Sequence, residues 1–500
     1  MRGIYPFVAA FLVIGIVMLA RPAENRAEIQ LSDTLSLSGY VRYELGLHAA
    51  EQNPNNAALY DDNNDINLAR SFFQTEITYK PSSVFKLFAN VRFSADQTAQ
   101  WDGDIDDYNA YPVDVPDDDW TMMKVSEDEW RAEVWELYGD IRHGNAWFRM
   151  GRQQIVWGEM IGARILDAIN PIDQSWNFLF EPEEFENIRI PQWSIRGSYN
   201  IQQNLLSWLS DLNVEGFVTP GDVLSNQRAE SGAPFNLMAF PPFFRIDEQD
   251  NRGSTEYGGR IGGLIGQVYG TLNYIHSYND DFSLDFTGLT PDPILGVPLR
   301  ASAGDMTRYA MLLDAEHKAI DLYGMSLNYA FGEPFNAVMT FEGAWVPNQP
   351  YGKAGSAQPE IEDQGTLNYA VRFDRPTQVV PKSFYAASFM TIQLQFKQTV
   401  VEGDEDDILG PNNSRIDKTV NNITLQLKQP LLHNDLNLTF QTVYDTDSAY
   451  MIKPWVQYKR GDHWYFDVFG VFLGGSEDRP GRFGSLYWAD TVYGRVTYQF

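Results

Sequence analysis

The sequence predicts an all-β protein, a transmembrane antiparallel up-and-down β-barrel formed by one domain over 28–500. Three observations predict it: apolar and polar residues alternate along segments of about ten residues, the connections between segments are short and long in turn, and an alternating strand ends the chain at Phe500. We expect about eighteen strands, with about sixteen as the alternative, because a sequence defines strand ends poorly.

Alternation with a period of two places successive side chains on opposite faces of a strand. Between 35 and 48, the odd positions hold Leu, Gly, Val and Tyr, whereas the even positions are mostly polar. The same pattern recurs at 85–94, 192–199, 390–397 and 423–428. A tilted strand needs about ten residues to cross a membrane. Apolar and polar residues also alternate in the strands of a soluble β-sandwich. The lengths of the connections must therefore distinguish the two folds.

The connections alternate in length, as they do in outer-membrane barrels with short periplasmic turns and long outer loops. Short ones include 80–83, 143–145 and 266–267. A sandwich has no reason to segregate loop lengths in this way. The segment 367–388, interrupted by Pro376 and Pro381, is the weakest part of the strand count. The predicted long connections are 49–67, 96–129, 158–190, 219–254, 279–307, 347–365, 400–418 and 474–486.

The N-terminus predicts export. Arg2 precedes an apolar run over 4–20, and a short polar stretch follows to Ala27. This order is typical of a secretory signal peptide over 1–27; a single membrane anchor is the alternative, although the run is short for a span of about 20 residues. After residue 27 no apolar stretch reaches about 18 residues, so only a closed barrel could cross a membrane.

The last strand predicts the route into the membrane. Val496, Tyr498 and Phe500 alternate with polar residues, and a terminal Phe resembles the signal that the barrel-assembly machinery reads in outer-membrane proteins. We therefore expect the outer membrane of a Gram-negative cell, with outer-membrane lipid and that machinery as partners.

Composition excludes several classes of protein. The 500 residues hold 37 Lys and Arg against 67 Asp and Glu, a net charge of −30, so no nucleic acid is expected as a partner. The absence of cysteine excludes disulfides and covalent c-type haem. Aromatic residues reach 14%, as the aromatic girdles of barrels require.

Acidic residues gather in the predicted outer loops, at 61–65, 102–107, 117–119 and 402–407. The run from Asp102 fails the test for an EF-hand, because Asp107 stands where Gly is needed and Val113 where Glu is needed. We expect a diffuse acidic rim that attracts cations, with no specific metal site and no cofactor.

Two blocks of sequence carry a family resemblance. Residues 151–159 read GRQQIVWGE and 167–173 read DAINPID; farther on, 321–328 read DLYGMSLN, followed by FEGAW at 341–345 and NQP at 348–350. Together they resemble the domain-of-unknown-function 1302 family of large bacterial outer-membrane β-barrel proteins. The resemblance implies an outer-membrane pore of unknown substrate and supplies no catalytic residues.

The excursion 158–190 mixes charged, apolar and aromatic residues. A loop that narrows a wide barrel needs this mixture, because apolar residues pack on the wall and charges face the path. An ordinary outer loop is the alternative. The candidate constriction residues are Trp157, Glu159, Arg164, Asp167 and Asp173, with Trp176 and Phe178 as further wall contacts.

The alternation also predicts which charges face the lumen. Two interpretations remain open: a transverse field that guides a charged or polar solute, and cross-strand ion pairs, which are the usual arrangement of inward charges. The predicted acids are Glu44, Glu76, Glu136, Asp140, Glu215, Asp374 and Asp467. The predicted bases are Arg42, Lys86, Arg92, Arg149, Arg196, Arg260, Arg372, Lys397, Lys428 and Arg495.

The sequence favours a pore for passive passage of a solute over an enzyme, because none of its six His has metal-ligand spacing or pairs with a nucleophilic Ser motif. Three alternatives stay open. One is a sleeve for a periplasmic multihaem cytochrome, and another is an export channel for lipid or polymer that works with an inner-membrane pump. The third is a membrane lipase, since triads are recognised by geometry.

Overall fold

The computed structural model describes residues 28–49, 66–98, 113–114, 123–127, 130–175, 185–201, 208–221, 224–227, 244–248, 253–291, 297–298, 308–353, 360–379, 389–403, 408–409, 417–446, 449–475, 483 and 486–500. Residues 1–27 lie outside this part, so the signal peptide stays a prediction. Trp176, Phe178 and the acidic runs at 61–65, 102–107, 117–119 and 404–407 lie outside it as well.

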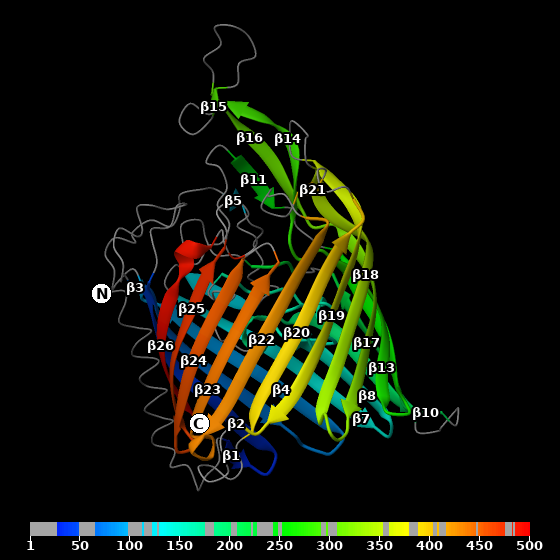
Figure 1. Ribbon diagram of the computed structural model, residues 1–500, viewed down its shortest axis with the longest axis vertical. Coiled ribbons are helices and arrows are strands. Elements are labelled where there is room, and N and C mark those ends of the chain that lie inside the picture. Colours follow the sequence, from blue (N-terminus) through cyan, green and yellow to red (C-terminus); the bar gives the residue numbers. More distant parts are fainter. Residues whose placement is uncertain are drawn as a thin grey trace.

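Eighteen long antiparallel strands form a closed barrel in the described chain (Figure 1), which confirms the predicted fold and the larger strand count. The last strand pairs with the first and closes the sheet. The strands are β2 (Leu35–His48), β3 (Ile66–Tyr79), β4 (Phe85–Asp96), β7 (Trp130–His143), β8 (Ala146–Gln153), β9 (Gln192–Ile201), β10 (Leu209–Pro220), β12 (Thr255–Ile265), β13 (Val268–Tyr278), β17 (Ala319–Phe331), β18 (Ala337–Lys353), β19 (Ile361–Thr377), β20 (Met390–Val401), β22 (Thr419–Leu431), β23 (Leu436–Asp445), β24 (Tyr450–Arg460), β25 (Trp464–Gly474) and β26 (Thr491–Gln499).

Short elements flank these strands. Three short strands join the edges of the same sheet: β1 (Ile29–Ser32), β6 (Lys124–Glu127) and β21 (Ile408–Leu409). The helical turns are α3 (Phe185–Ile188), η2 (Leu432–Asn434) and η3 (Tyr487–Ala489). Within the residues described, no helix is long and apolar enough to cross a membrane.

Side-chain exposure follows the predicted alternation. On the outer face, Leu272 is 62% exposed and Leu394 is 47% exposed, as expected for apolar groups that meet lipid. On the inner face, Glu215, Thr271 and Gln395 are buried. The wall is therefore apolar outside and polar inside.

Connections differ in length between the two ends of the barrel, broadly as predicted, and we name the end with the long connections the outer end. Two connections depart from the pattern: 378–389 is long at the opposite end, and 446–449 is short at the outer end. The predicted loop 347–365 is largely strand, because β18 and β19 run past the membrane wall to Lys353 and from Ile361. Pro376 lies one residue before the end of β19, opposite Thr391, near the strand end where a missing N–H is tolerated.

A second sheet, which the sequence did not predict, forms from segments of three predicted outer loops and from residues 308–316, directly after the predicted loop 279–307. Its strands are β5 (Val113–Asp114), β11 (Phe244–Glu248), β14 (Ser283–Pro291), β15 (Val297–Pro298) and β16 (Arg308–Glu316). β11 runs parallel to both β5 and β16, so the sheet joins segments far apart in the chain. A small apolar core of Ile246, Phe282 and Leu313 supports it above the outer end of the barrel (Figure 1).

Candidate functional site

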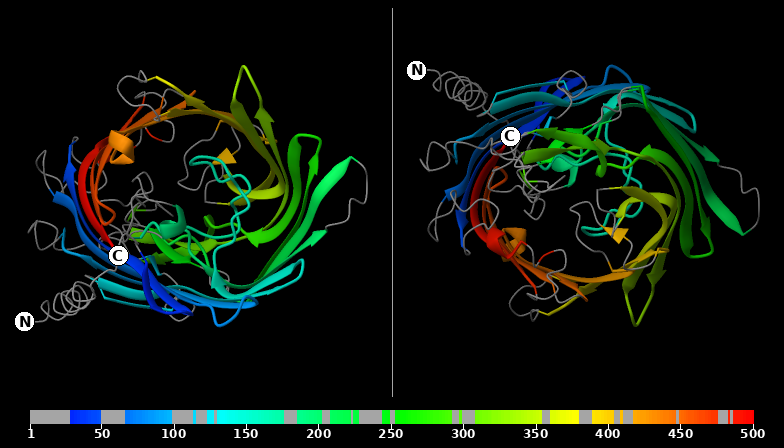
Figure 2. Two further views of the ribbon diagram at one scale, coloured as in Figure 1. Left: turned by 90° about the horizontal axis from the view of Figure 1, so that it is seen from below. Right: turned by 90° about the horizontal axis from the view of Figure 1, so that it is seen from above.

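Residues 154–191, here the inserted segment, connect β8 to β9, and their described parts, 154–175 and 185–191, enter the barrel interior (Figure 2). Its tip reaches β20: the Ile161 N–H donates to the inward Gln395 Oε1 at 2.9 Å, and Gln395 Nε2 donates to the Ile161 carbonyl at 3.0 Å. The Glu159 N–H donates to the Glu342 carboxylate on β18, and Arg372 on β19 donates to the Glu159 carbonyl. The segment therefore extends across the interior from β8 to β18–β20.

Apolar packing fixes the segment to the wall. Its buried side chains form one cluster with apolar residues on the inner faces of β10, β13 and β17–β19. A Cβ added at Gly324 would lie 2.3 Å from Leu166, so this close approach needs glycine. The cluster comprises Ile155, Trp157, Ile165, Leu166, Ile169, Phe217, Ile275, Ile320, Leu322, Ala344, Val346 and Ala370.

A charged group anchors the start of the segment. The Trp157 Nε1 donates to Glu215 Oε1 on β10 at 2.7 Å. The same carboxylate accepts from Arg196 at 2.7 Å and from Arg260 at 3.0 Å. Because Trp157 and Glu215 are buried, this hydrogen bond is protected from competing water.

A bidentate ion pair ties the two halves of the segment together. Arg189 donates from Nη2 and Nε to the two Asp167 oxygens at 2.5 and 3.1 Å. Asn170 adds a second tie, since its Oδ1 accepts from the Ile155 N–H at 2.7 Å and its Nδ2 donates to the Ile190 carbonyl at 2.8 Å. Removing any of these buried partners leaves a polar group without compensation.

Gly151 turns Arg152 toward the segment. Its φ of 131° lies where glycine is favoured, and an added Cβ would lie 2.2 Å from the Leu137 carbonyl oxygen. Arg152 is fully buried and donates to the carbonyls of Pro191 and Val134 at 3.1 Å. It therefore fastens the end of the inserted segment to β7 and β8.

The five predicted constriction residues divide into two groups. Trp157, Asp167 and Asp173 are buried and anchor the segment. The two aspartates therefore differ from the expectation that charged residues of the loop face the solute path. Arg164 is half-buried, and Glu159 is exposed at the tip. The difference arises because a segment that enters a lumen must first satisfy its own backbone and its own charges.

Two carboxyl groups of the segment and its surroundings have shifted pKa values. Burial opposes ionisation of Asp173, but Arg131, whose Nη1 lies 2.9 Å from Asp173 Oδ2, lowers the pKa of that carboxyl. At the outer end, burial raises the pKa of Asp280 to about 6, although Arg164 Nη1 lies 3.4 Å from its carboxylate. The charge of Asp280, and with it the contact to Arg164, therefore changes near pH 6.

Cross-strand pairs account for most of the predicted lumen bases. Arg42 differs: its Nε donates to Thr497 Oγ1 at 3.3 Å. These contacts fit the ion-pair interpretation of the inner wall. Arg372 pairs with Asp374 on its own strand, β19, at 2.9 Å. The cross-strand pairs are Lys86–Asp140 at 3.4 Å, Arg92–Glu133 at 2.8 Å, Arg149–Asp140 at 2.7 Å, Arg196–Glu215 at 2.7 Å, Arg260–Glu215 at 3.0 Å and Arg495–Asp467 at 3.5 Å.

Sequence reasoning missed several residues of this site. Glu342 and Gly324 belong to the second block of the family resemblance, but no role was predicted for them. The structure brings both blocks together, since Glu159 meets Glu342 and Leu166 meets Gly324. Arg189 and Gln395 had no local signal, because each acts on a partner distant in the chain.

Comparison with known proteins agrees with this architecture. The family described as a protein of unknown function (DUF1302) matches residues 7–500. Among solved structures, the chain is similar to OccAB3 of Acinetobacter baumannii, at 9% identity over 93% of this chain and 99% of that one, with a TM-score of 0.50. OccAB1 of the same organism is 12% identical over 93% of this chain and 96% of that one, with a TM-score of 0.43. Salmonella typhi OmpF, solved with daunomycin, is 10% identical over 95% of this chain and 100% of that one, with a TM-score of 0.39.

At these identities the likeness shows the fold alone, a large β-barrel. No curated protein sequence matches the chain significantly.

Proposed function

The chain belongs to the DUF1302 family, and from that premise we propose that it is a passive channel in a Gram-negative outer membrane, narrowed by its inserted segment. The observation that carries the proposal is a wide closed barrel with a polar inner face. Barrels of sixteen to eighteen strands leave an aqueous channel unless something fills them. The inward Lys428 is exposed, as a side chain that meets water in the lumen would be.

The inserted segment is proposed as the constriction. It is fixed to the wall by buried pairs and packing, so its position is set before any solute enters. Its exposed Glu159 lies beside Arg372, which pairs with Asp374. Opposite charges close together on a narrow path would order polar solutes and set ion preference.

The alternatives fit the interior less well. A cytochrome sleeve needs a lumen clear enough for a chain of haem groups, and a segment bonded from β8 to β20 opposes that use. An export channel would need a pump as partner, and nothing in the described residues favours one direction of transport. We propose no catalytic role, because the charged groups described in the interior serve to pair strands and hold the segment.

Single-channel conductance in planar bilayers tests the proposal. Deleting 160–188 should raise conductance several-fold and weaken ion preference, because the constriction is gone. Gln395→Leu removes only the two hydrogen bonds to Ile161. Its mean conductance should lie closer to that of the wild type than the conductance of the deletion variant does, and its current should fluctuate more because the tip of the segment is less firmly held. Thr439→Ser, on the inner face of β23, serves as the matched control.

Two results would contradict different parts of the proposal. Unchanged conductance after deletion of 160–188, in a properly assembled barrel, would overturn the constriction. The absence of any ion conductance in the wild-type protein would overturn the channel itself.

A further inference from the structure

The inner wall differs in chemistry between its two sides. From β4 to β12, beside the inserted segment, charged side chains form pairs such as Arg149–Asp140. On β20, β22 and β23 the inward side chains are mainly amides and hydroxyls, and the charged exceptions are Lys397, Lys428 and Asp445. The two sides therefore offer different partners to a solute.

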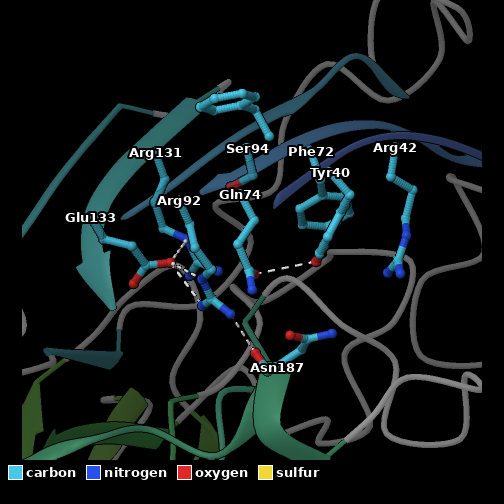
Figure 3. Close-up of a pocket in the computed structure, with 10 residues that line it drawn as sticks. Tyr40, Arg42, Phe72, Gln74, Arg92, Ser94, Arg131, Glu133 and Asn187 are labelled. Atoms are coloured by element: carbon cyan, nitrogen blue, oxygen red, sulfur yellow. Dashed lines mark hydrogen bonds and ion pairs between the residues drawn. The ribbon is translucent and has the colours of Figure 1, made fainter. Parts of the chain in front are cut away.

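The charged side leaves little room for a solute. Figure 3 shows a pocket there, lined by Arg92, Arg131, Glu133 and Asn187 among others. The pocket has space for about one water molecule. Arg92 donates to Glu133 at 2.8 Å and to the Asn187 carbonyl at 2.6 Å, and Arg131 lies 2.9 Å from Asp173. These cations are already held by protein groups, so this part of the wall serves to fix the inserted segment.

Three amides form a row on the uncharged side. Gln393 on β20 lies directly opposite Gln426 on β22, which lies directly opposite Gln441 on β23. Residues directly opposite one another share a face of the sheet, and this face is the inner one because Gln395, two residues from Gln393, meets the inserted segment. We name Gln393, Gln426 and Gln441 the amide row. Since neighbouring strands lie about 4.8 Å apart, the row extends over about 10 Å.

An ion pair at one end orients the amide row. Asp374 on β19 pairs with Arg372 at 2.9 Å, and its Oδ1 accepts from Gln393 Nε2 at 2.8 Å. A carboxylate can only accept, so Gln393 turns its nitrogen to Asp374 and its oxygen to Gln426. Gln393 Oε1 then accepts from Gln426 Nε2 at 2.8 Å. The chain of bonds stops there, since Gln426 Oε1 accepts from none of the residues described.

Gln441 ends the row with an amide that lacks a protein partner. Its side chain makes no hydrogen bond within the part of the chain that the structure describes, although the residue is only 8% exposed. A buried amide without a partner is costly, so water or a solute at the inner wall must supply the missing bonds. An amide presents a donor and an acceptor side by side, which suits hydroxyl groups because each hydroxyl can both donate and accept.

The row lies at the level of the constriction. Gln395 holds the tip of the inserted segment at Ile161, and Arg372 donates to the Glu159 carbonyl. Gln393 and Gln426 are half-buried, so both side chains keep some exposed surface beside the tip. A solute that passes the tip along β20 and β22 would therefore contact the amide row.

We propose that the amide row binds a neutral solute with many hydroxyl groups, a sugar, as it passes the constriction. The free amide of Gln441 and the free oxygen of Gln426 replace hydrogen bonds that the sugar loses with water. Two neighbouring hydroxyls can pair with the oxygen and the nitrogen of one amide, and the length of the row suits two sugar rings in line. The inference rests on the proposed channel function and adds the class of solute.

Block of the potassium chloride current through single channels by maltose tests the inference. Maltose should interrupt the current at a lower concentration than maltobionate, its anionic oxidation product. It should also act at a lower concentration than a polyethylene glycol of comparable size, which is neutral but lacks neighbouring hydroxyls. Gln441→Leu should weaken the maltose block about tenfold, because a donor and an acceptor are lost, and Gln441→Asn should weaken it less, because the amide is kept.

Gln457→Leu is the matched control. It makes the same change on the inner face of β24, outside the amide row, where the Gln457 amide donates to Asp467 at 2.9 Å. The maltose block should be unchanged in this variant.

The outcomes separate the two proposals. Channels that conduct potassium chloride but respond to maltose no more than to the polyethylene glycol would overturn the solute class and leave the channel standing. Block by maltobionate at an equal or lower concentration would show that the wall does not select neutral solutes. Equal weakening by Gln457→Leu would replace the amide row with a general effect of lumen polarity. Without any conductance, the channel proposal itself fails.

Discussion

Leu394 and Gln395 are neighbours on β20 with opposite surroundings: the leucine projects toward lipid, whereas the glutamine is buried against the inserted segment. Leu394→Arg should cost about 2–4 kcal/mol of folding free energy, since it places a charge in the apolar wall. Thr439→Arg on the inner face of β23 is the control and should cost much less. Urea unfolding in lipid vesicles measures both. Similar costs for the two variants would show that the faces are misassigned.

The Arg189–Asp167 pair is buried and bidentate, so its two partners should act as one unit. Arg189→Met alone leaves a buried carboxylate and should destabilise the inserted segment by about 3–5 kcal/mol, whereas Arg189→Met with Asp167→Leu should restore most of it. Limited proteolysis of the assembled barrel, followed at 154–191, reports on the segment. If the double variant is cleaved faster than the single one, the pair does not hold the segment by charge compensation.

Asp280 supplies a pH dependence with a definite sign. Its folded pKa of about 6 exceeds the ordinary 3.8, so folding favours the protonated form. That stabilisation is complete below about pH 4 and is lost as the pH rises through about 6. Asp280→Asn should therefore stabilise the protein more at pH 8 than at pH 4. Heat-dependent gel mobility at both pH values measures this, and an equal effect at both would contradict the shift.

At the scale of elements, Phe500 directly follows β26 and extends the β2–β26 pairing that closes the barrel. The Phe500 N–H donates to the Gly39 carbonyl at 2.9 Å, the Gly39 N–H donates to the Phe500 carbonyl at 3.0 Å, and the Phe500 ring stacks on Phe73. A Cβ at Gly39 would lie 2.9 Å from the Phe500 ring, so the glycine makes room for it. Aromatic cover of a strand glycine is a known stabilising device in sheets.

Deleting Phe500 should impair outer-membrane assembly and leave processing at the predicted signal peptide unchanged. The deletion removes both the predicted recognition signal and the packing of Phe500 on Gly39 and Phe73. Surface labelling in cells measures assembly, and folding into detergent without the machinery isolates the packing. Gly39→Val should slow both assembly in cells and folding into detergent. Normal surface levels of the truncated protein would remove the role predicted for the terminal Phe.

At the scale of the whole molecule, the acidic excess of the chain bears on the ion preference of the channel. The acidic runs at 102–107 and 117–119 are predicted to attract cations to the mouth. Val113 and Asp114 form β5 of the outer sheet, so a deletion should stop before them. Removing 102–112 should lower cation preference in about 0.01 M salt and have little effect at 1 M, where charges are screened within about 3 Å. Reversal potentials measure this, and an effect of equal size at high salt would contradict a diffuse field.

The fold of the wall could be predicted because its determinants are local. Alternation of residues such as Leu394 and Gln395 assigns each side chain to lipid or lumen, and the membrane requires every backbone group to be paired within the barrel. The position of the inserted segment could be predicted only as a candidate, since Trp157 and Glu159 show a mixture of residues and give no direction. What each residue does there was beyond the sequence.

The sequence by itself determined the closed barrel, its apolar outer face and the charges of its inner face, because a period of two is written in consecutive residues. The tertiary structure alone decided the partners: Asp167 with Arg189, Ile161 with Gln395, and β11 between β5 and β16. Asp167 and Arg189 are 22 positions apart in the chain, and Ile161 and Gln395 are 234 positions apart. No local pattern encodes them, because each joins residues that only the tertiary structure brings together.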